Sequence, residues 1–169
     1  GVTGATGYTG HTGYTGHTGA GLDCGVSGTI LGGATGIATS SATGSIFIGC
    51  EAGNSTITQP YNTFIGYQAG KGNDSTQESV CIGTRTLQVG SGTGVVAIGF
   101  EAGINQSDGS YTIAIGYQPA QNSQQQNAIA IGHLSGRNNQ GTGSVAIGSQ
   151  AGLDHQAEES IAIGSQAGQ

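Results

Sequence analysis

The segments SVAIGSQAG at 144–152 and SIAIGSQAG at 160–168 differ at a single position. Each contains an apolar residue followed by glycine, and that pair recurs nine times along the chain. The pairs are Leu31-Gly32, Ile48-Gly49, Ile65-Gly66, Ile82-Gly83, Ile98-Gly99, Ile115-Gly116, Ile131-Gly132, Ile147-Gly148 and Ile163-Gly164. Successive pairs differ in residue number by either 16 or 17 throughout. A short, nearly fixed period of this kind indicates a repeat architecture in which each unit stacks on its neighbours.

Each repeat begins with a short apolar run, such as Val145-Ala146-Ile147, which predicts a strand. Side chains alternate between the two faces of a strand, and both faces of this run exclude polar groups. A strand of this kind is expected to be buried on both sides. We expect the Ile and Val face to line the interior of a parallel β-solenoid. The small-residue face is expected to pack near a three-fold axis between chains, through Ala97, Ala114, Ala130, Ala146 and Ala162.

The segments between these strands are polar and rich in glycine. The glycine after each apolar residue suits a sharp corner with positive φ. The stretches 54–61, 71–78, 104–111 and 121–127 are rich in Asn, Gln, Ser and Asp, and are expected to be surface turns. No segment has helical periodicity. The region 29–169 is therefore predicted to be an all-β solenoid of about nine rungs, forming a rod of roughly 40 Å.

The region 1–19 follows a different rule, with glycine at 1, 4, 7, 10, 13, 16 and 19. A strict glycine in every third position indicates a collagen-like triple helix, because only glycine fits its crowded axis. A flexible Gly/Thr linker is the alternative, although linkers do not keep a three-residue frame. We expect a triple-helical stalk at 1–20 and a junction at 21–28. Three chains then wind together, so a homotrimer is predicted.

The stalk resembles the Gly-Xaa-Thr stalks of bacterial spore-surface and viral collagen-like proteins. Threonine fills the third position of every triplet. In those proteins such threonines can carry sugars. The resemblance therefore implies candidate O-glycosylation at Thr3, Thr6, Thr9, Thr12, Thr15 and Thr18.

The S-I/V-A-I-G units resemble the head repeats of trimeric autotransporter adhesins of the YadA type, and the resemblance extends over the whole of 29–169. That resemblance implies a left-handed parallel β-roll in a tight trimer, and an adhesin function. Joined to a Gly-Xaa-Thr stalk, the chain is also similar to fibre proteins of large DNA viruses, phages and bacterial surfaces. No ligand-binding residue follows from the resemblance.

Composition limits the range of functions. The chain has 35 glycines, 7% charged residues and a net charge of −6, with Lys71, Arg85 and Arg137 as its only cations. These features argue against a nucleic-acid partner. No apolar run approaches the length that a membrane-spanning helix requires, so membrane insertion is not expected. Histidines and carboxylates form no catalytic or metal-ligand pattern, so we expect no enzyme activity, no cofactor and no metal.

Three cysteines and three sequons are the candidate covalent sites. An odd number of cysteines suggests a bond between chains or free thiols, and Cys24, just past the triplet frame, is the candidate for an interchain disulfide. Cys81 occupies the small-residue face and is expected to be a packed thiol. The N-glycosylation pattern occurs at Asn54, Asn73 and Asn105, all in predicted turns.

Alignment of the repeats places side chains in columns along the rod. Two positions after the corner glycine come Glu51, Gln68, Arg85 and Glu101, so Arg85 is expected to pair with Glu101. One position earlier lie Tyr67, Phe100 and Tyr117. This aromatic column is consistent with sugar or protein binding, or with ordinary turn packing.

The sequence therefore predicts an extracellular, homotrimeric structural fibre on a virion, phage or cell surface, serving as a rigid appendage or filament subunit. The alternative is an adhesin or receptor-binding tip with a host-surface glycan or protein as its ligand. The sequence begins at Gly1, so an upstream segment is expected, and it ends at Gln169 without a polar capping repeat. An uncapped solenoid end favours truncation or head-to-tail self-assembly into filaments.

Overall fold

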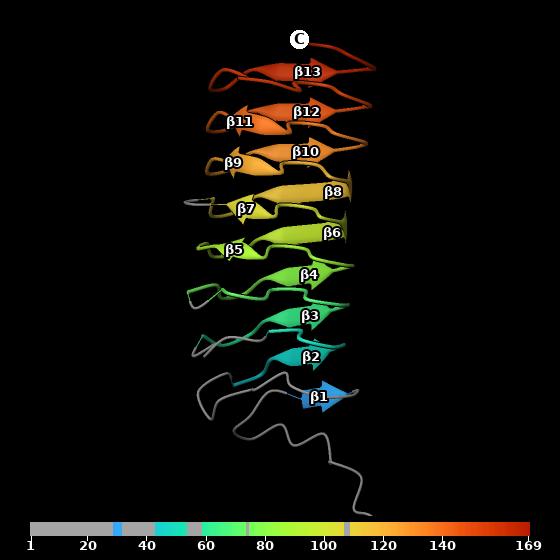
Figure 1. Ribbon diagram of the computed structural model, residues 1–169. Coiled ribbons are helices and arrows are strands. Elements are labelled where there is room, and N and C mark those ends of the chain that lie inside the picture. The colour runs from blue at the N-terminus through green and yellow to red at the C-terminus, as the bar shows by residue number, and fades with distance from the viewer. Residues whose placement is uncertain (1–28, 32–42, 54–58, 74, 107–108) are drawn as a thin grey trace, which may run out of the picture.

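The computed structural model describes residues 29–31, 43–53, 59–73, 75–106 and 109–169. Within these ranges the chain is an all-β parallel solenoid without helix, as the repeat pattern predicts (Figure 1). The predicted stalk at 1–20 and the junction at 21–28 lie outside the described residues. So do the six candidate threonines, Cys24 and Asn54.

The first strand of each rung joins a nine-stranded parallel sheet whose order follows the chain. Its strands coincide with the nine predicted repeats, and identical positions of neighbouring repeats pair, as Ala130 does with Ala146. From β2 to β13 the chain makes about seven turns. The strands are β1 (Thr29–Leu31), β2 (Ile46–Ile48), β3 (Thr63–Ile65), β4 (Val80–Ile82), β6 (Val96–Phe100), β8 (Ile113–Tyr117), β10 (Ile129–Ile131), β12 (Val145–Ile147) and β13 (Ile161–Ile163).

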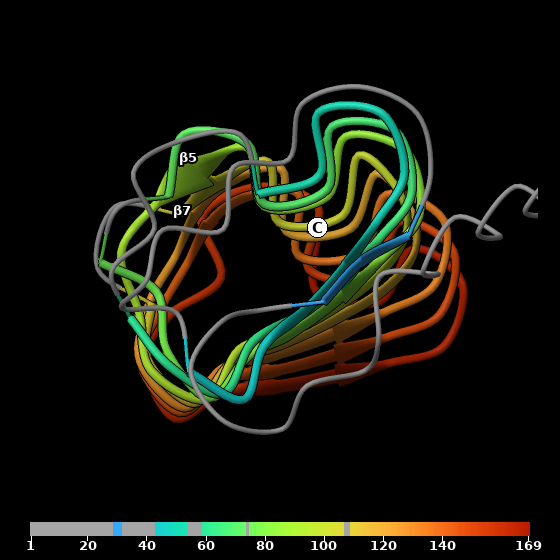
Figure 2. The same cartoon turned by 90° about the horizontal axis from the view of Figure 1, so that it is seen from below.

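A second parallel sheet lies on another side of the rungs, as the view along the stack shows (Figure 2). The sequence assigned two of its four short strands, at 105–106 and 122–124, to polar surface turns, and that assignment was wrong. The strands are β5 (Val89–Gly90), β7 (Asn105–Gln106), β9 (Asn122–Gln124) and β11 (Asn138–Gln140). They form a sheet because each rung's backbone donors and acceptors are met by the rung above and below, whatever the side chains are.

The two faces of the first sheet are reversed relative to the sequence prediction. Ala97, Ala114, Ala130 and Ala146 are fully buried inside the solenoid of a single chain, and Ala162 is 4% exposed. The prediction that these alanines pack on an axis between chains was wrong. The interior is narrow because side chains from the second sheet share it. The alanines of the first sheet therefore point inward, and the branched Ile and Val side chains of the same strands point outward.

The interior is filled in two different ways along the stack. In the early rungs Phe47 and Phe64 fill it, with ring centroids 5.3 Å apart. The Phe64 ring occupies the space beside Gly70, where a Cβ would overlap it. In later rungs alanine replaces phenylalanine, and buried Gln106, Gln124, Gln140 and Gln156 fill the volume. A large side chain on one wall is thus matched by a small one on the other.

Glycines form a continuous column at the end of the first strand of each rung. Gly49, Gly66, Gly83, Gly99, Gly116, Gly132, Gly148 and Gly164 have φ between 121° and 137°. A Cβ on Gly132 would lie 2.5 Å from the carbonyl oxygen of Gly148, one rung further on. The close stacking of rungs at this corner therefore requires glycine both for its backbone angle and for its lack of a side chain.

Candidate binding surfaces

The outward face of the first sheet is a ladder of mostly apolar, branched side chains, two per rung, that we call the apolar strip. Its members are half-buried or exposed, with Ile46 41% and Ile82 37% exposed. The strip consists of Ile46, Ile48, Thr63, Ile65, Val80, Ile82, Val96, Ile98, Ile113, Ile115, Ile129, Ile131, Val145, Ile147, Ile161 and Ile163. An exposed apolar surface that is continuous along a whole molecule marks an interaction site.

A column of side chains, polar except for Leu134, follows the corner glycines, and we call it the corner column. It consists of Glu51, Gln68, Arg85, Glu101, Gln118, Leu134, Gln150 and Gln166. Each has a φ between 50° and 59°, which is strained for residues other than glycine. Backbone amides of this column donate to the neighbouring rung, as Gln118 does to the Phe100 carbonyl at 2.8 Å, and these bonds hold the strained geometry.

The side chains of the corner column form a network of charges and amides. Arg85 Nη1 lies 2.8 Å from Glu101 Oε1, the ion pair that the sequence predicts. Gln118 Nε2 donates to Glu101 Oε2 at 2.8 Å. Glu51 Oε2 accepts from Lys71 Nζ at 2.6 Å and from Gln68 Nε2 at 2.7 Å. The Lys71–Glu51 pair is partly exposed on both sides and contributes at most about 1 kcal/mol. Glu101 is buried, and Arg85 and Gln118 provide the partners that its carboxylate needs there.

Hydrogen bonds from Lys71, and then from Gln68, lower the pKa of the Glu51 carboxyl below its usual value of 4.5. A lowered pKa in the folded state means that Glu51 stabilises the fold above the unfolded pKa, and that this contribution disappears as the pH falls through the folded pKa. Glu51 is therefore ionised at neutral pH and holds Lys71 in place.

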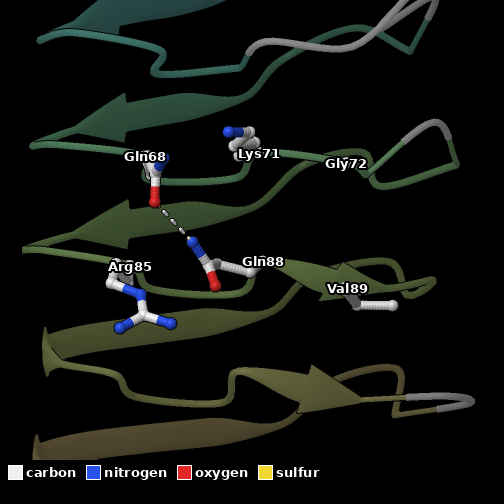
Figure 3. Close-up of a pocket in the computed structure, with 6 residues that line it drawn as sticks. All are labelled: Gln68, Lys71, Gly72, Arg85, Gln88 and Val89. Atoms are coloured by element: carbon white, nitrogen blue, oxygen red, sulfur yellow. Dashed lines mark hydrogen bonds between the residues drawn. The ribbon is translucent and has the colours of Figure 1, made fainter.

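A cavity of about 400 Å³ opens beside this network, between the turns that follow β3 and β4 (Figure 3). Lys71 and Arg85 line it together with two amide side chains, one of which, Gln88 Nε2, donates to Gln68 Oε1 at 2.9 Å. The other lining residues are Gly72 and Val89. Lys71 and Arg85 thus both line this opening, but their charged ends are directed to different rungs, at Glu51 and at Glu101. The sequence did not predict that they line one opening, because Lys71 and Arg85 belong to different repeats and to different columns.

The predicted aromatic column is only partly continuous. Phe100 and Tyr117 stack with ring centroids 5.2 Å apart and an interplanar angle of 16°. His133, which the sequence analysis did not include, continues the stack at 5.4 Å from Tyr117. The rings of Phe100, Tyr117 and His133 cover one another's faces. Sugar rings bind to aromatic faces, so this geometry favours the interpretation as packing between turns.

Two of the sequons lie in the described residues. Asn73 is fully buried and its amide nitrogen donates to the Leu87 carbonyl, so its assignment as a glycosylation site was wrong. Asn105 is exposed in β7, and its amide nitrogen donates to Asn122 Oδ1 at 3.1 Å. That ladder continues through Asn138 to Asp154. Asn105 stays a candidate acceptor.

The two described cysteines differ in environment. Cys81 is buried between Phe64 and Ala97 in the interior column, as the sequence predicts, and burial raises the pKa of its thiol. Cys50 lies exposed in the turn after β2. Both are free thiols.

Metal-ligand clusters and membrane-spanning helices are both absent from the part of the chain that the structure describes. The described ranges contain no group of three or more His, Cys, Asp or Glu side chains that could hold a metal ion. They also contain no helix that is long and apolar enough to cross a membrane.

The interior glutamines are the main feature that the sequence analysis missed. Gln124, Gln140 and Gln156 occupy the same position in successive repeats, and each donates to two carbonyls of its own rung, such as Ile129 and Ser144 for Gln140. Their period equals that of the strands, so the signal was present in the sequence. It was missed because glutamine in a polar stretch is usually a surface residue.

The fold and these surfaces define the chain as a parallel β-solenoid repeat protein. No known protein family, curated protein or solved structure matches the chain.

Proposed function

We propose that the chain is a structural fibre protein that assembles side by side, as a homotrimer, through the apolar strip. The observation that carries the proposal is the strip itself. Its branched side chains form two ranks that run from β2 to β13, and residues such as Ile46 are 41% exposed in a single chain. At about 25 cal/mol per Å² of apolar surface removed from water, covering such a strip is strongly favourable.

The partner that fits the strip best is another copy of the chain. The strip repeats once per rung, at the spacing of about 4.8 Å between hydrogen-bonded strands. A second solenoid with the same repeat presents branched side chains at the same interval, so each rank can interdigitate with its counterpart along the full length. A partner without this period would match the strip at only a few points.

The triplet frame supports three copies. Glycine in every third position over 1–19 suits three wound chains. The resemblance to head repeats of YadA-type adhesins supports a left-handed β-roll in the same trimeric arrangement. We place the fibre outside cells, on a virion, phage or bacterial surface, in a structural role without catalysis.

A charged substitution on the strip tests this proposal. Ile131→Lys places an ammonium in the middle of the strip and should reduce the mass measured by sedimentation velocity from three chains to one. Gln126→Lys adds the same charge at an exposed site in the turn before β10, and should leave the mass unchanged. Far-UV circular dichroism of both variants checks that the β-structure persists. If both variants kept the mass of three chains, or if both lost it equally, the role of the strip would be overturned.

A further inference from the structure

Four of the chain's six tyrosines lie in the solenoid, in two copies of one arrangement. YNTFIGY at 61–67 and YTIAIGY at 111–117 each have one tyrosine two residues before the first strip residue of the rung, and another two residues after the second. Their side chains are between 48% and 61% exposed. The four are Tyr61, Tyr67, Tyr111 and Tyr117. In the rungs of β3 and β8, a tyrosine therefore stands at each edge of the apolar strip.

The two tyrosines at the start of these strands, Tyr61 and Tyr111, are held in place by the preceding rung. Their backbone amides donate to that rung, as Tyr111 does to the Thr93 carbonyl at 2.7 Å. One edge of each ring lies beside a glycine, so that a Cβ on Gly44 or Gly94 would come within 2.9 Å of the ring's Cδ1. Both rings thus have a fixed direction along the rod and remain exposed.

The two tyrosines at the end of these strands differ in their neighbours. Tyr117 stacks between Phe100 and His133, so its faces are covered and its exposed part is the ring edge. Tyr67 lies between Cys50 and Thr84 in the same column, and neither of these is aromatic. Aromatic rings attract one another edge to face. The exposed parts of both tyrosines therefore suit a second aromatic ring.

The symmetry of a closed trimer determines which edges of the strip lie next to each other. The strands of the first sheet are parallel, as the arrows in Figure 1 show. If three such rods stand around an axis with their strips facing it, rotation brings the end of each copy's strands to the start of the next copy's strands. Cyclic interfaces of this kind join two different patches. Rotation also keeps every rung at its height, so the same rungs meet.

At equal height the residues at the two edges match. We call the residues two positions before the strip the entry column and those two positions after it the exit column. The entry column is Gly44, Tyr61, Glu78, Gly94, Tyr111, Asn127, Gly143 and Glu159. The exit column is Cys50, Tyr67, Thr84, Phe100, Tyr117, His133, Ser149 and Ser165. Rung by rung, both tyrosines of one column then face the two tyrosines of the other.

Polar members of the two columns also face each other at equal height. Glu78 faces Thr84, and Asn127 faces His133, so each pair combines a hydrogen-bond donor with an acceptor. An offset of one rung removes both tyrosine pairs, and in one direction it places Tyr67 against Glu78. The two columns therefore favour copies that stand in register.

We propose that the copies of the trimer meet edge to edge at equal height, with Tyr61 and Tyr111 of each copy against Tyr67 and Tyr117 of the next. The inference rests on the proposed trimer and names the residues that close it. The rings cover the sides of the apolar strip, and their hydroxyl groups reach the water at the rim of the interface.

Photo-oxidative crosslinking of the full chain tests this contact. Persulfate, with a photo-excited ruthenium complex, takes one electron from each of two phenols, each phenol releases one proton, and the two radicals join through one carbon–carbon bond. Tyr8→Phe and Tyr14→Phe in every protein remove the two tyrosines of 1–19. This parent protein should give covalent dimers and trimers on a denaturing gel. Ile131→Lys keeps all four tyrosines in a single chain and should give neither.

Two double variants separate this arrangement from a contact between like edges. Tyr61→Phe/Tyr111→Phe leaves only the exit tyrosines, and Tyr67→Phe/Tyr117→Phe leaves only the entry tyrosines. Each should keep the mass of three chains and lose the crosslinked bands, because phenylalanine keeps the ring but forms no phenoxyl radical. When the two variants are co-expressed, mixed trimers should give covalent dimers but no covalent trimer, because only one of their three junctions has tyrosine on both sides.

Several outcomes would overturn the proposal. Bands that persist in either double variant alone would show that like edges meet. A parent protein of three chains without bands, or co-expressed variants without covalent dimers, would show that the entry and exit edges do not meet. In these cases the measured mass leaves the trimer proposal standing. Bands of equal strength in Ile131→Lys would show random collisions and would also overturn the contact, and a parent mass of one chain would overturn the trimer and the contact together.

Discussion

At the scale of single residues, the corner glycines decide whether rungs can stack. Each has a φ that side chains rarely adopt, and all but the last lie against the backbone of the next rung. Gly116 and Gly164 have the same place in their repeats but differ in one respect. A Cβ on Gly116 would overlap the Gly132 carbonyl, whereas a Cβ on Gly164 would meet nothing closer than Ala167 Cβ at 4.0 Å.

This difference separates backbone strain from steric overlap. Gly164→Ala should cost about 1–3 kcal/mol, the penalty for holding a side-chain-bearing residue at a φ of 121°. Gly116→Ala adds the overlap between rungs and should cost more than about 3 kcal/mol of the free energy of unfolding. Urea unfolding followed by circular dichroism measures both. Equal costs would show that the glycine column is needed for its backbone angle alone.

The two described cysteines should react at very different rates in the native protein. Cys81 is buried and its raised pKa keeps it a thiol, whereas Cys50 is exposed. Thiolate and access both control alkylation, so iodoacetamide should modify Cys50 in minutes and Cys81 at least about a hundredfold more slowly. Peptide mass mapping gives the rate at each site. In urea the two rates should converge, and equal native rates would contradict the interior position of Cys81.

At the scale of the elements, the sequence predicted where the strands lie but not which face they bury. The sequence period located the strands of the first sheet at the nine repeats, because stacked rungs place equivalent residues of each repeat beside one another. The faces were reversed because Val145, Ala146 and Ile147 are all apolar, and alternation alone cannot distinguish inside from outside. The side chains that decide it, such as Gln140, come from the second sheet, across the interior.

The interior glutamines should therefore contribute as much to the free energy of unfolding as the alanines that they face. Gln124 Nε2 donates to the carbonyls of Ala128 at 2.9 Å and Ile113 at 3.1 Å, and its Oε1 accepts from Gln106 at 2.8 Å. Gln124→Leu leaves these groups without their partner, and each unsatisfied buried group costs about 1–3 kcal/mol. A loss of about 3 kcal/mol or more in the free energy of unfolding is expected.

The neighbouring residue provides the control for this loss. Gln125 is exposed, and Gln125→Leu should change the free energy of unfolding by less than about 0.5 kcal/mol. Thermal or urea unfolding of the two variants under the same conditions gives the comparison. If Gln124→Leu were as stable as the wild type, the amide-filled interior would be contradicted.

At the scale of the whole molecule, the side chains sort into an interior, a glycine corner, the corner column and the apolar strip. None of these depends on one rung, because each is a column that extends through the stack. The opening lined by Lys71 and Arg85 is the exception, since it uses a local departure from the repeat. Repetition predicts the columns from sequence, whereas an opening lined by unlike residues on adjacent rungs is visible only once the rungs are stacked.

The central claim is that the apolar strip joins copies of the chain, and the native mass tests it most directly. Light scattering after size exclusion, at several concentrations, should give a fixed mass of three chains, or three times 16.5 kDa. Mass that grows with concentration would indicate open-ended filaments and contradict a closed trimer. A single chain at every concentration would leave the strip in water and contradict the assembly altogether.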